Sequence, residues 1–209
     1  MNILKAAMAV IVLGLAGLFA SCSSGSSNDP IVPSETTAKA TSAEMVADYY
    51  IGDSLLDYTD IKIVYTDADG KQQTVPVEQS KCKKQQGKNE PYYVYELKVK
   101  TTKFPTTLTA KMEVTPKEDA VLENAKTSPC VYLSNSYTVN FYDKDGKTIS
   151  TKELIASSTR DQDFRLDDNA KKMMKEVLKQ MLNEQLTFFK LDKTVNVSIT
   201  ADNASYELK

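Results

Sequence analysis

Apolar and polar side chains alternate with a period of two residues over much of the chain after residue 60. This period predicts antiparallel strands that bury one face and expose the other to water. Turn residues separate the alternating segments into pairs, which predicts four β-hairpins. Their strands are expected at 61–66 and 72–77, at 91–100 and 108–114, at 131–142 and 148–150, and at 195–200 and 205–208.

One segment near the C-terminus instead repeats its apolar residues at helical spacing. It predicts a helix of about 20 residues that starts near Asp167 or Asp168, either of which suits a helix N-cap. Lysines occupy the opposite, outward side. The apolar stripe consists of Leu166, Ala170, Met173, Met174, Val177, Leu178, Met181, Leu182, Leu186 and Phe189.

A second, shorter helix is predicted over 42–50. Thr41 and Glu44 have the spacing of a capping box, and Met45, Val46 and Tyr49 follow at helical intervals. Together these elements predict an α+β, mostly β fold: an antiparallel β-sandwich-like domain of about eight strands with one long amphipathic helix near the C-terminus. A lipocalin-like barrel is the alternative, ranked lower because its usual Gly-x-Trp signature needs a tryptophan and the chain has none.

The pattern Asp-x-Asp-Gly-Lys occurs twice, at 67–71 and 143–147. A calcium loop would need an oxygen ligand at its fifth position and glycine at its sixth, but here lysine is fifth and glycine fourth. We therefore interpret both segments as hairpin turns and predict no metal site. The pair indicates either two related halves of the fold or convergence on the same turn chemistry.

The N-terminus carries Lys5 and then an apolar run over 6–19, which is typical of a secretory leader. The run is shorter than the roughly 20 apolar residues of a spanning helix. Ala20 and Ser21 directly before Cys22 resemble a bacterial lipobox. The resemblance implies that Cys22 is lipidated and becomes the first residue of the mature protein. An ordinary leader cut near Ala20 is the alternative.

The leader and the serine-rich segment after it also resemble those of Bacteroidetes lipoproteins, over residues 1–30. The resemblance implies an address rather than an activity. The expected organisation is a lipoprotein signal peptide at 1–21, a flexible tether at 22–41 and a single β-rich globular domain at 42–209. Serine rather than aspartate beside Cys22 favours lipid anchoring to the outer membrane of the bacterial cell envelope, with the domain facing the periplasm.

Composition excludes several classes of function. The chain has no histidine, which rules out Ser-His-Asp and Cys-His catalysis and every histidine-ligated metal site. A formal net charge of −2 and only two arginines argue against nucleic-acid binding. Hydrolysis by paired carboxylates survives, although the acids at 161–168 are explained by the start of the long helix. We predict no catalytic residue, metal or cofactor.

Cys82 and Cys130 are the two cysteines left once Cys22 carries lipid. An even pair in an exported protein favours a disulfide, and two separately buried thiols are the alternative. If Cys82 stays free, its lysine neighbours at 81, 83 and 84 are expected to lower its pKa.

Tyrosines supply a tentative ligand surface, consisting of Tyr92, Tyr93, Tyr95 and Tyr132. Core packing or cross-strand pairing is the competing interpretation.

The function expected is that of a non-enzymatic envelope lipoprotein whose domain is structural or binds an envelope protein or a glycan. One alternative is a pilin or adhesin subunit, although those resemble chains cleaved after an early arginine and none precedes Arg160. Another is a small-ligand or glycan-binding protein, or a weak carboxylate-dependent hydrolase.

Overall fold

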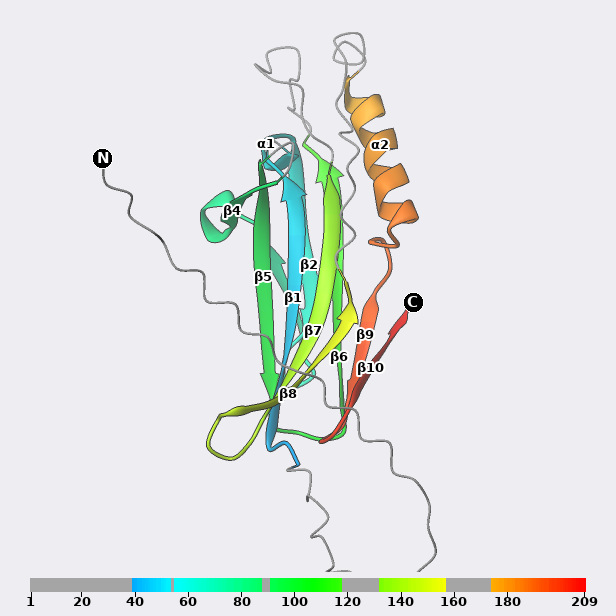
Figure 1. Ribbon diagram of the computed structural model, residues 1–209. Coiled ribbons are helices and arrows are strands. Elements are labelled where there is room, and N and C mark those ends of the chain that lie inside the picture. Colours follow the sequence, from blue (N-terminus) through cyan, green and yellow to red (C-terminus); the bar gives the residue numbers. More distant parts are fainter. Residues whose placement is uncertain (1–38, 54, 88–90, 118–131, 157–173) are drawn as a thin grey trace, which may run out of the picture. The chain divides into compact units, whose positions relative to one another are not determined.

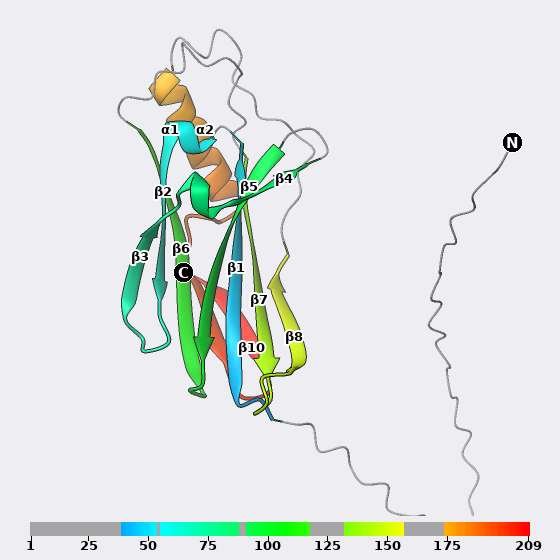
Figure 2. The same ribbon diagram turned by 90° about the vertical axis from the view of Figure 1, so that its left-hand side faces the viewer.

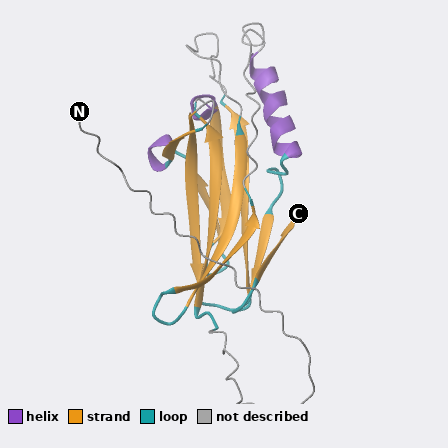
Figure 3. Cartoon of the chain, viewed as in Figure 1, coloured by secondary structure: helices purple, strands orange, loops and turns teal. Residues whose placement is uncertain are grey.

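The computed structural model describes residues 39–53, 55–87, 91–117, 132–156 and 174–209, all within one compact unit that spans 37–209. Within these residues the chain forms two five-stranded antiparallel sheets that pack face to face as a sandwich, with one long helix at an end (Figures 1 and 3). The expected mostly β, sandwich-like α+β fold is confirmed, and the lipocalin-like barrel is wrong because the strands form two separate sheets.

Each sheet is built around one central strand. Sheet A has the order β4-β5-β1-β7-β8 and sheet B the order β10-β9-β6-β2-β3, with every pairing antiparallel. The strands of sheet A are β4 (Lys83–Gln86), β5 (Pro91–Thr101), β1 (Ser42–Gly52), β7 (Leu133–Tyr142) and β8 (Thr148–Ile155). Those of sheet B are β10 (Ala204–Leu208), β9 (Val195–Ile199), β6 (Thr106–Pro116), β2 (Thr59–Thr66) and β3 (Gln72–Pro76).

The helix predicted over 42–50 is wrong, because these residues form β1. Its buried side chains follow a period of two, not the helical period. β1 pairs with β5 along one side and with β7 along the other. The stabilisation from pairing in two ladders outweighs a weak local preference for helix. The fully buried positions are Ala43, Met45, Ala47, Tyr49 and Ile51.

The second predicted hairpin is also wrong in its pairing. Both strands exist with the expected alternation, but β5 belongs to sheet A and β6 to sheet B. Residues 102–105 therefore carry the chain from one sheet to the other rather than around a hairpin. Alternation specifies which face of a strand is buried, and two strands on opposite sides of a core alternate just as a hairpin does.

The other three hairpins are confirmed as β2–β3, β7–β8 and β9–β10. The edge strand β4, the short helix α1 (Leu55–Tyr58) and a 3₁₀ turn at Gln79–Lys81 were not predicted. The long helix is confirmed as α2 (Met174–Phe188), whereas its predicted start and its candidate caps lie outside the described residues. Leu178 and Leu182 of α2 are buried in the core.

The two Asp-x-Asp-Gly-Lys segments fold as matching turns. In each, one carboxylate oxygen of the first aspartate accepts hydrogen bonds from two backbone N–H groups, at 3.0 and 2.9 Å for Asp67 and at 2.9 Å twice for Asp143. The turn glycines have φ values of 79° and 77°, a left-handed conformation that favours glycine. The prediction that these are hairpin turns is thus confirmed.

These turns belong to matching runs of strands. β1 lies at the centre of sheet A and is followed by the β2–β3 hairpin at the edge of sheet B. β6 lies at the centre of sheet B and is followed by the β7–β8 hairpin at the edge of sheet A. Each hairpin therefore pairs with the central strand of the other run.

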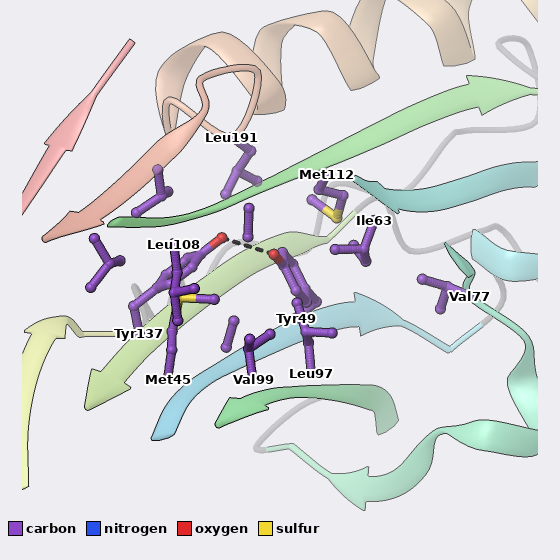
Figure 4. Close-up of a cluster of buried hydrophobic side chains, with 14 of the residues drawn as sticks. Met45, Tyr49, Ile63, Val77, Leu97, Val99, Leu108, Met112, Tyr137 and Leu191 are labelled. Atoms are coloured by element: carbon purple, nitrogen blue, oxygen red, sulfur yellow. Dashed lines mark hydrogen bonds between the residues drawn. The ribbon is translucent and has the colours of Figure 1, made fainter. Parts of the chain in front are cut away.

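The core contains one polar contact at its centre, between the hydroxyl groups of Tyr49 and Tyr137 (Figure 4). The two oxygens lie 2.8 Å apart, and both side chains are almost completely buried, with exposed fractions of 0% and 1%. Burial raises the pKa of both hydroxyls, so both stay protonated at neutral pH. One hydroxyl donates and the other accepts, so each has a partner inside an apolar environment, where an unpaired polar group is costly.

Replacing one member of this pair is expected to cost more than replacing both. Tyr137→Phe leaves the Tyr49 hydroxyl buried without its partner, which should lower the free energy of unfolding by about 1–3 kcal/mol. The double variant with Tyr49→Phe removes both polar groups and should cost less than the sum of the two single changes. Chemical denaturation of the four proteins measures this, and strictly additive losses would contradict the pairing.

Candidate ligand-binding face

Three tyrosine rings gather on the face of sheet A that points away from the core. Tyr50, on β1, has its ring centroid 6.0 Å from that of Tyr92, on β5. Tyr92 in turn lies 6.5 Å from Tyr132, which directly precedes β7. All three side chains are partly exposed. We call Tyr50, Tyr92 and Tyr132 the tyrosine cluster, and it crosses the centre of the sheet near the end of β1.

A glycine makes this gathering possible. Gly52 is the strand partner of Tyr92 on one side, and on the other its N–H donates to the carbonyl of Tyr132 at 2.8 Å. Tyr92 and Tyr132 are thus two strands apart, roughly 9.6 Å across the sheet. Because Gly52 has no side chain, their rings can meet above its backbone. Glycine inside a strand commonly marks such a close approach.

Polar neighbours hold the rings in place. The Tyr92 hydroxyl donates to the side-chain amide oxygen of Gln85 on β4, at 2.8 Å. The hydroxyls of Tyr50 and Ser136 lie 3.3 Å apart, across the β1–β7 ladder. Two of the three rings are therefore anchored through their hydroxyl groups.

A pair of carboxylates adjoins the cluster on the same face. Asp48 precedes Tyr50 by two residues on β1, and its direct partner across the ladder is Glu96 of β5. Like charges placed opposite each other in a sheet destabilise it. Burial, and secondly the charge of Glu96, raise the pKa of Asp48.

Glu96 is in the opposite electrostatic situation. Its carboxylate contacts the ammonium groups of Lys98 at 3.0 Å and Lys83 at 3.4 Å. The hydrogen bond from Lys98 is the largest cause of a lowered Glu96 pKa. Asp48 has no hydrogen bond or ion pair within the part of the chain that the structure describes. The face therefore presents one carboxylate held by two lysines beside one that is half-buried and has no hydrogen bond or ion pair with a described residue, although the charges of Lys83 and Lys98 oppose the rise in its pKa.

The opposite end of the same face carries a separate polar group. Tyr142 of β7 donates its hydroxyl proton to Glu44 of β1 at 3.2 Å, and the Lys100 ammonium lies 5.2 Å from the Tyr142 ring centroid. Here tyrosine, carboxylate and lysine already satisfy one another. This group is a natural control for the tyrosine cluster.

The structure separates the four tyrosines of the predicted ligand surface. Tyr92 and Tyr132 lie in the cluster, whereas Tyr93 and Tyr95 point to the opposite face of β5, where Tyr93 is buried and Tyr95 packs against the core. The alternation of β5 already placed Tyr92 and Tyr93 on different faces. Asp48 and Tyr50 were missed because residues 42–50 were predicted to be helical.

The cysteine predictions have different outcomes. Cys82 is half-buried, its thiol lies 3.3 Å from the carbonyl oxygen of Glu78, and burial raises its pKa. The lowered pKa expected from its lysine neighbours is wrong: Lys81 and Lys83 pair with Glu78 and Glu96. Cys130 lies outside the described residues, as does Cys22, so the disulfide and the lipidation site stay predictions.

Hollows of about 340 Å³ occur at two places on sheet B, one beside the start of β2 and the other beside the start of β6. Neither of these two hollows borders the tyrosine cluster.

The described residues contain no group of three or more Cys, Asp or Glu side chains that could hold a metal ion. The helices described here include none that is long and apolar enough to span a membrane.

No protein family, curated protein or solved structure matches this chain. Function is therefore inferred from the geometry of the face itself.

Replacing Asp48 by Asn is expected to stabilise the fold at neutral pH. Because the pKa of Asp48 is raised in the folded state, its contribution to stability is present at low pH and is lost as pH rises through the folded-state pKa. At pH 7 the ionised side chain therefore opposes folding. The neutral amide should raise the free energy of unfolding by up to about 1 kcal/mol, which corresponds to ~3 °C in Tm.

The gain should vanish near pH 3, where Asp48 itself is protonated. Thermal melts at both pH values measure the difference. Glu44→Gln, on the same strand and face, is the control and should bring no comparable gain because Glu44 accepts a hydrogen bond from Tyr142. Equal stability of Asp48→Asn and the parent protein at pH 7 would contradict the electrostatic account.

Proposed function

We propose that this chain is a lipid-anchored envelope protein that binds an envelope partner, a glycan or a protein, without chemical turnover, through the outer face of sheet A. One observation carries the binding part of the proposal: the tyrosine cluster is held in place beside Asp48, a half-buried carboxylate that has no hydrogen bond or ion pair with any described residue. Natural sequences retain such unfavourable groups chiefly at functional sites.

The anchor is proposed at Cys22, on the outer membrane and facing the periplasm. The lipobox-like Ala20-Ser21-Cys22 and the serine-rich residues after it support this part. Lipidation matters physically because a single acyl chain holds a protein to a membrane only marginally, whereas two or more hold it stably.

The direction of β1 supports a membrane-distal binding face. The chain enters the fold at Ala40, whose N–H donates to the carbonyl of Ala201, and Thr41 donates to Tyr142 at the same end. β1 then runs to Gly52, below the tyrosine cluster, over about 33 Å. A tether that joins the domain at Ala40 therefore leaves the cluster at the far end of the central strand.

Removing the thiol of Cys22 should release the protein from the membrane. Cys22→Ala is expected to move it from the detergent phase to the aqueous phase of a detergent phase partition, because no acyl chain can then be attached. Partition of solubilised cells and immunoblotting measure the lipid anchor independently of any binding through the face of sheet A. Cys82→Ala is the matched control and should stay in the detergent phase; continued partition of Cys22→Ala into the detergent phase would defeat the anchoring proposal.

The binding face is tested by adding back soluble protein. The full-length Cys22→Ala protein should cosediment with envelopes isolated from the bacterium that encodes it. Adding Tyr92→Ala should lower the bound fraction about tenfold or more, because the ring and its contact with Tyr50 are lost. Tyr142→Ala, on the same face but at its other end, should leave binding unchanged. Absence of cosedimentation, or equal losses for both variants, would contradict the proposed face.

A carboxylate-dependent hydrolase is the second candidate function. Asp48 and Glu96 face each other across the ladder, and their surroundings move their pKa values in opposite directions, as in the acid and base of a glycosidase. We favour binding because the Glu96 carboxylate is already held by the ammonium groups of Lys98 and Lys83. Release of new reducing ends from a bound glycan, abolished by Asp48→Asn, would favour the hydrolase instead.

A further inference from the structure

We infer that the ligand of this face is an electrically neutral saccharide chain, lying across β4, β5, β1 and β7 and stacking sugar rings on Tyr50 and Tyr92. This inference rests on the proposed binding function and specifies its ligand class. It is carried by three properties of the face: anchored aromatic rings, a hydrogen-bond acceptor to which no described residue donates, and balanced charge on the strands beneath them.

The anchored rings provide an apolar platform that is ready before binding. The Tyr92 hydroxyl is hydrogen-bonded to Gln85, and the Tyr50 hydroxyl is hydrogen-bonded to Ser136. The partly exposed remainder of each tyrosine side chain is therefore mostly ring carbon. A tyrosine held by its hydroxyl loses little conformational entropy when a ligand stacks on it. The apolar C–H face of a sugar ring suits such a platform, while its hydroxyl groups remain free for polar contacts.

Asp48 offers the acceptor that those sugar hydroxyls need. Glu44 already accepts from Tyr142, and Glu96 already accepts from two lysines. Asp48 alone among these three carboxylates has no such contact in the described part of the chain. Hydrogen bonds from a neutral donor to a carboxylate are short and strong, and they favour its charged form. A saccharide hydroxyl next to Tyr50 would therefore relieve the unfavourable burial of Asp48.

Charge on this face argues against a charged partner. The outward positions of β1 and β5, with the adjoining position of β4, carry three carboxylates and three ammonium groups. These belong to Glu44, Asp48 and Glu96, and to Lys83, Lys98 and Lys100. Electrostatic complementarity normally draws a charged ligand to a surface of the opposite sign. A balanced surface offers no such attraction to a basic peptide or to an acidic polysaccharide, so the neutral ligand is favoured.

The breadth of the site favours a chain over a single sugar. The tyrosine cluster and its polar neighbours extend from Gln85 on β4 to Ser136 on β7, across four adjacent strands of sheet A (Figure 2). Four strands span about 14 Å between their axes. A single sugar would reach only part of this width, whereas several linked sugars would add their contacts together.

The test uses the full-length Cys22→Ala protein in affinity electrophoresis through gels that contain soluble starch, dextran, mannan, xylan or β-1,3-glucan. At least one of these neutral polysaccharides should retard the protein, with similar affinity in 50 and 500 mM NaCl. Tyr92→Ala should weaken binding at least tenfold, and Tyr142→Ala should not change it. Tyr50→Ala replaces Tyr92→Ala if the latter does not fold.

Asp48→Asn separates a binding role from a structural one. It should weaken saccharide binding about tenfold while it raises Tm at pH 7, a combination that a purely structural side chain would not give. The control Glu44→Gln should keep full affinity.

Four outcomes would overturn the inference. Binding that disappears in 500 mM NaCl would indicate a charged ligand, and equal losses for Tyr92→Ala and Tyr142→Ala would place the site elsewhere. Failure to bind any of the five polysaccharides, with cosedimentation to whole envelopes intact, would reject the saccharide and keep the proposed binding function. Loss of envelope binding as well would reject both.

Discussion

Pairing along both sides of β1 is the constraint on which the rest of the domain depends. From Ala43 to Ile51, each residue of β1 has a partner on both β5 and β7. One face of the strand supplies the centre of the core, including Tyr49, and the other supplies Asp48 and Tyr50 of the candidate site. A shift of one residue in this register would exchange the two faces, burying a carboxylate in the core and exposing the apolar side chains. The same hydrogen bonds therefore maintain both the fold and the site.

Much of the architecture could be predicted from periodicity and turn chemistry. Alternation identified most strands, and the Asp-x-Asp-Gly-Lys segments correctly marked two turns. The failures have physical causes. In β1, the alternation of Ala43, Met45 and Ala47 was hidden by an outward Val46 and a plausible capping box. For β5 and β6, periodicity specified the buried face but contains no information about the partner strand. The tyrosine cluster needed Gly52 between two strands far apart in sequence, which only the register reveals.

With the proposed binding role, Asp48 places stability and binding in opposition at one position. A carboxylate at the centre of a sheet, opposite a second carboxylate, weakens the folded state unless something compensates it. Lysines compensate Glu96, but Asp48 receives no matching contact from the described residues. Such a group lowers the free energy of unfolding of the free protein. A ligand that donates a hydrogen bond to it would remove this penalty and would bind more tightly for that reason. This is the usual relation between a stable scaffold and a site that is completed from outside.

The matching runs β1-β2-β3 and β6-β7-β8 have a consequence for the biogenesis of the domain. Each central strand needs the hairpin of the other run, so neither sheet can be completed from one half of the chain. Ser42, at the start of β1, pairs with Tyr142, about a hundred residues later. Contacts of such long range slow folding. For the exported lipoprotein proposed above, a chain that emerges N-terminus first would thus remain open until most of its length is available, which is the condition in which a polypeptide can be threaded through a narrow export channel.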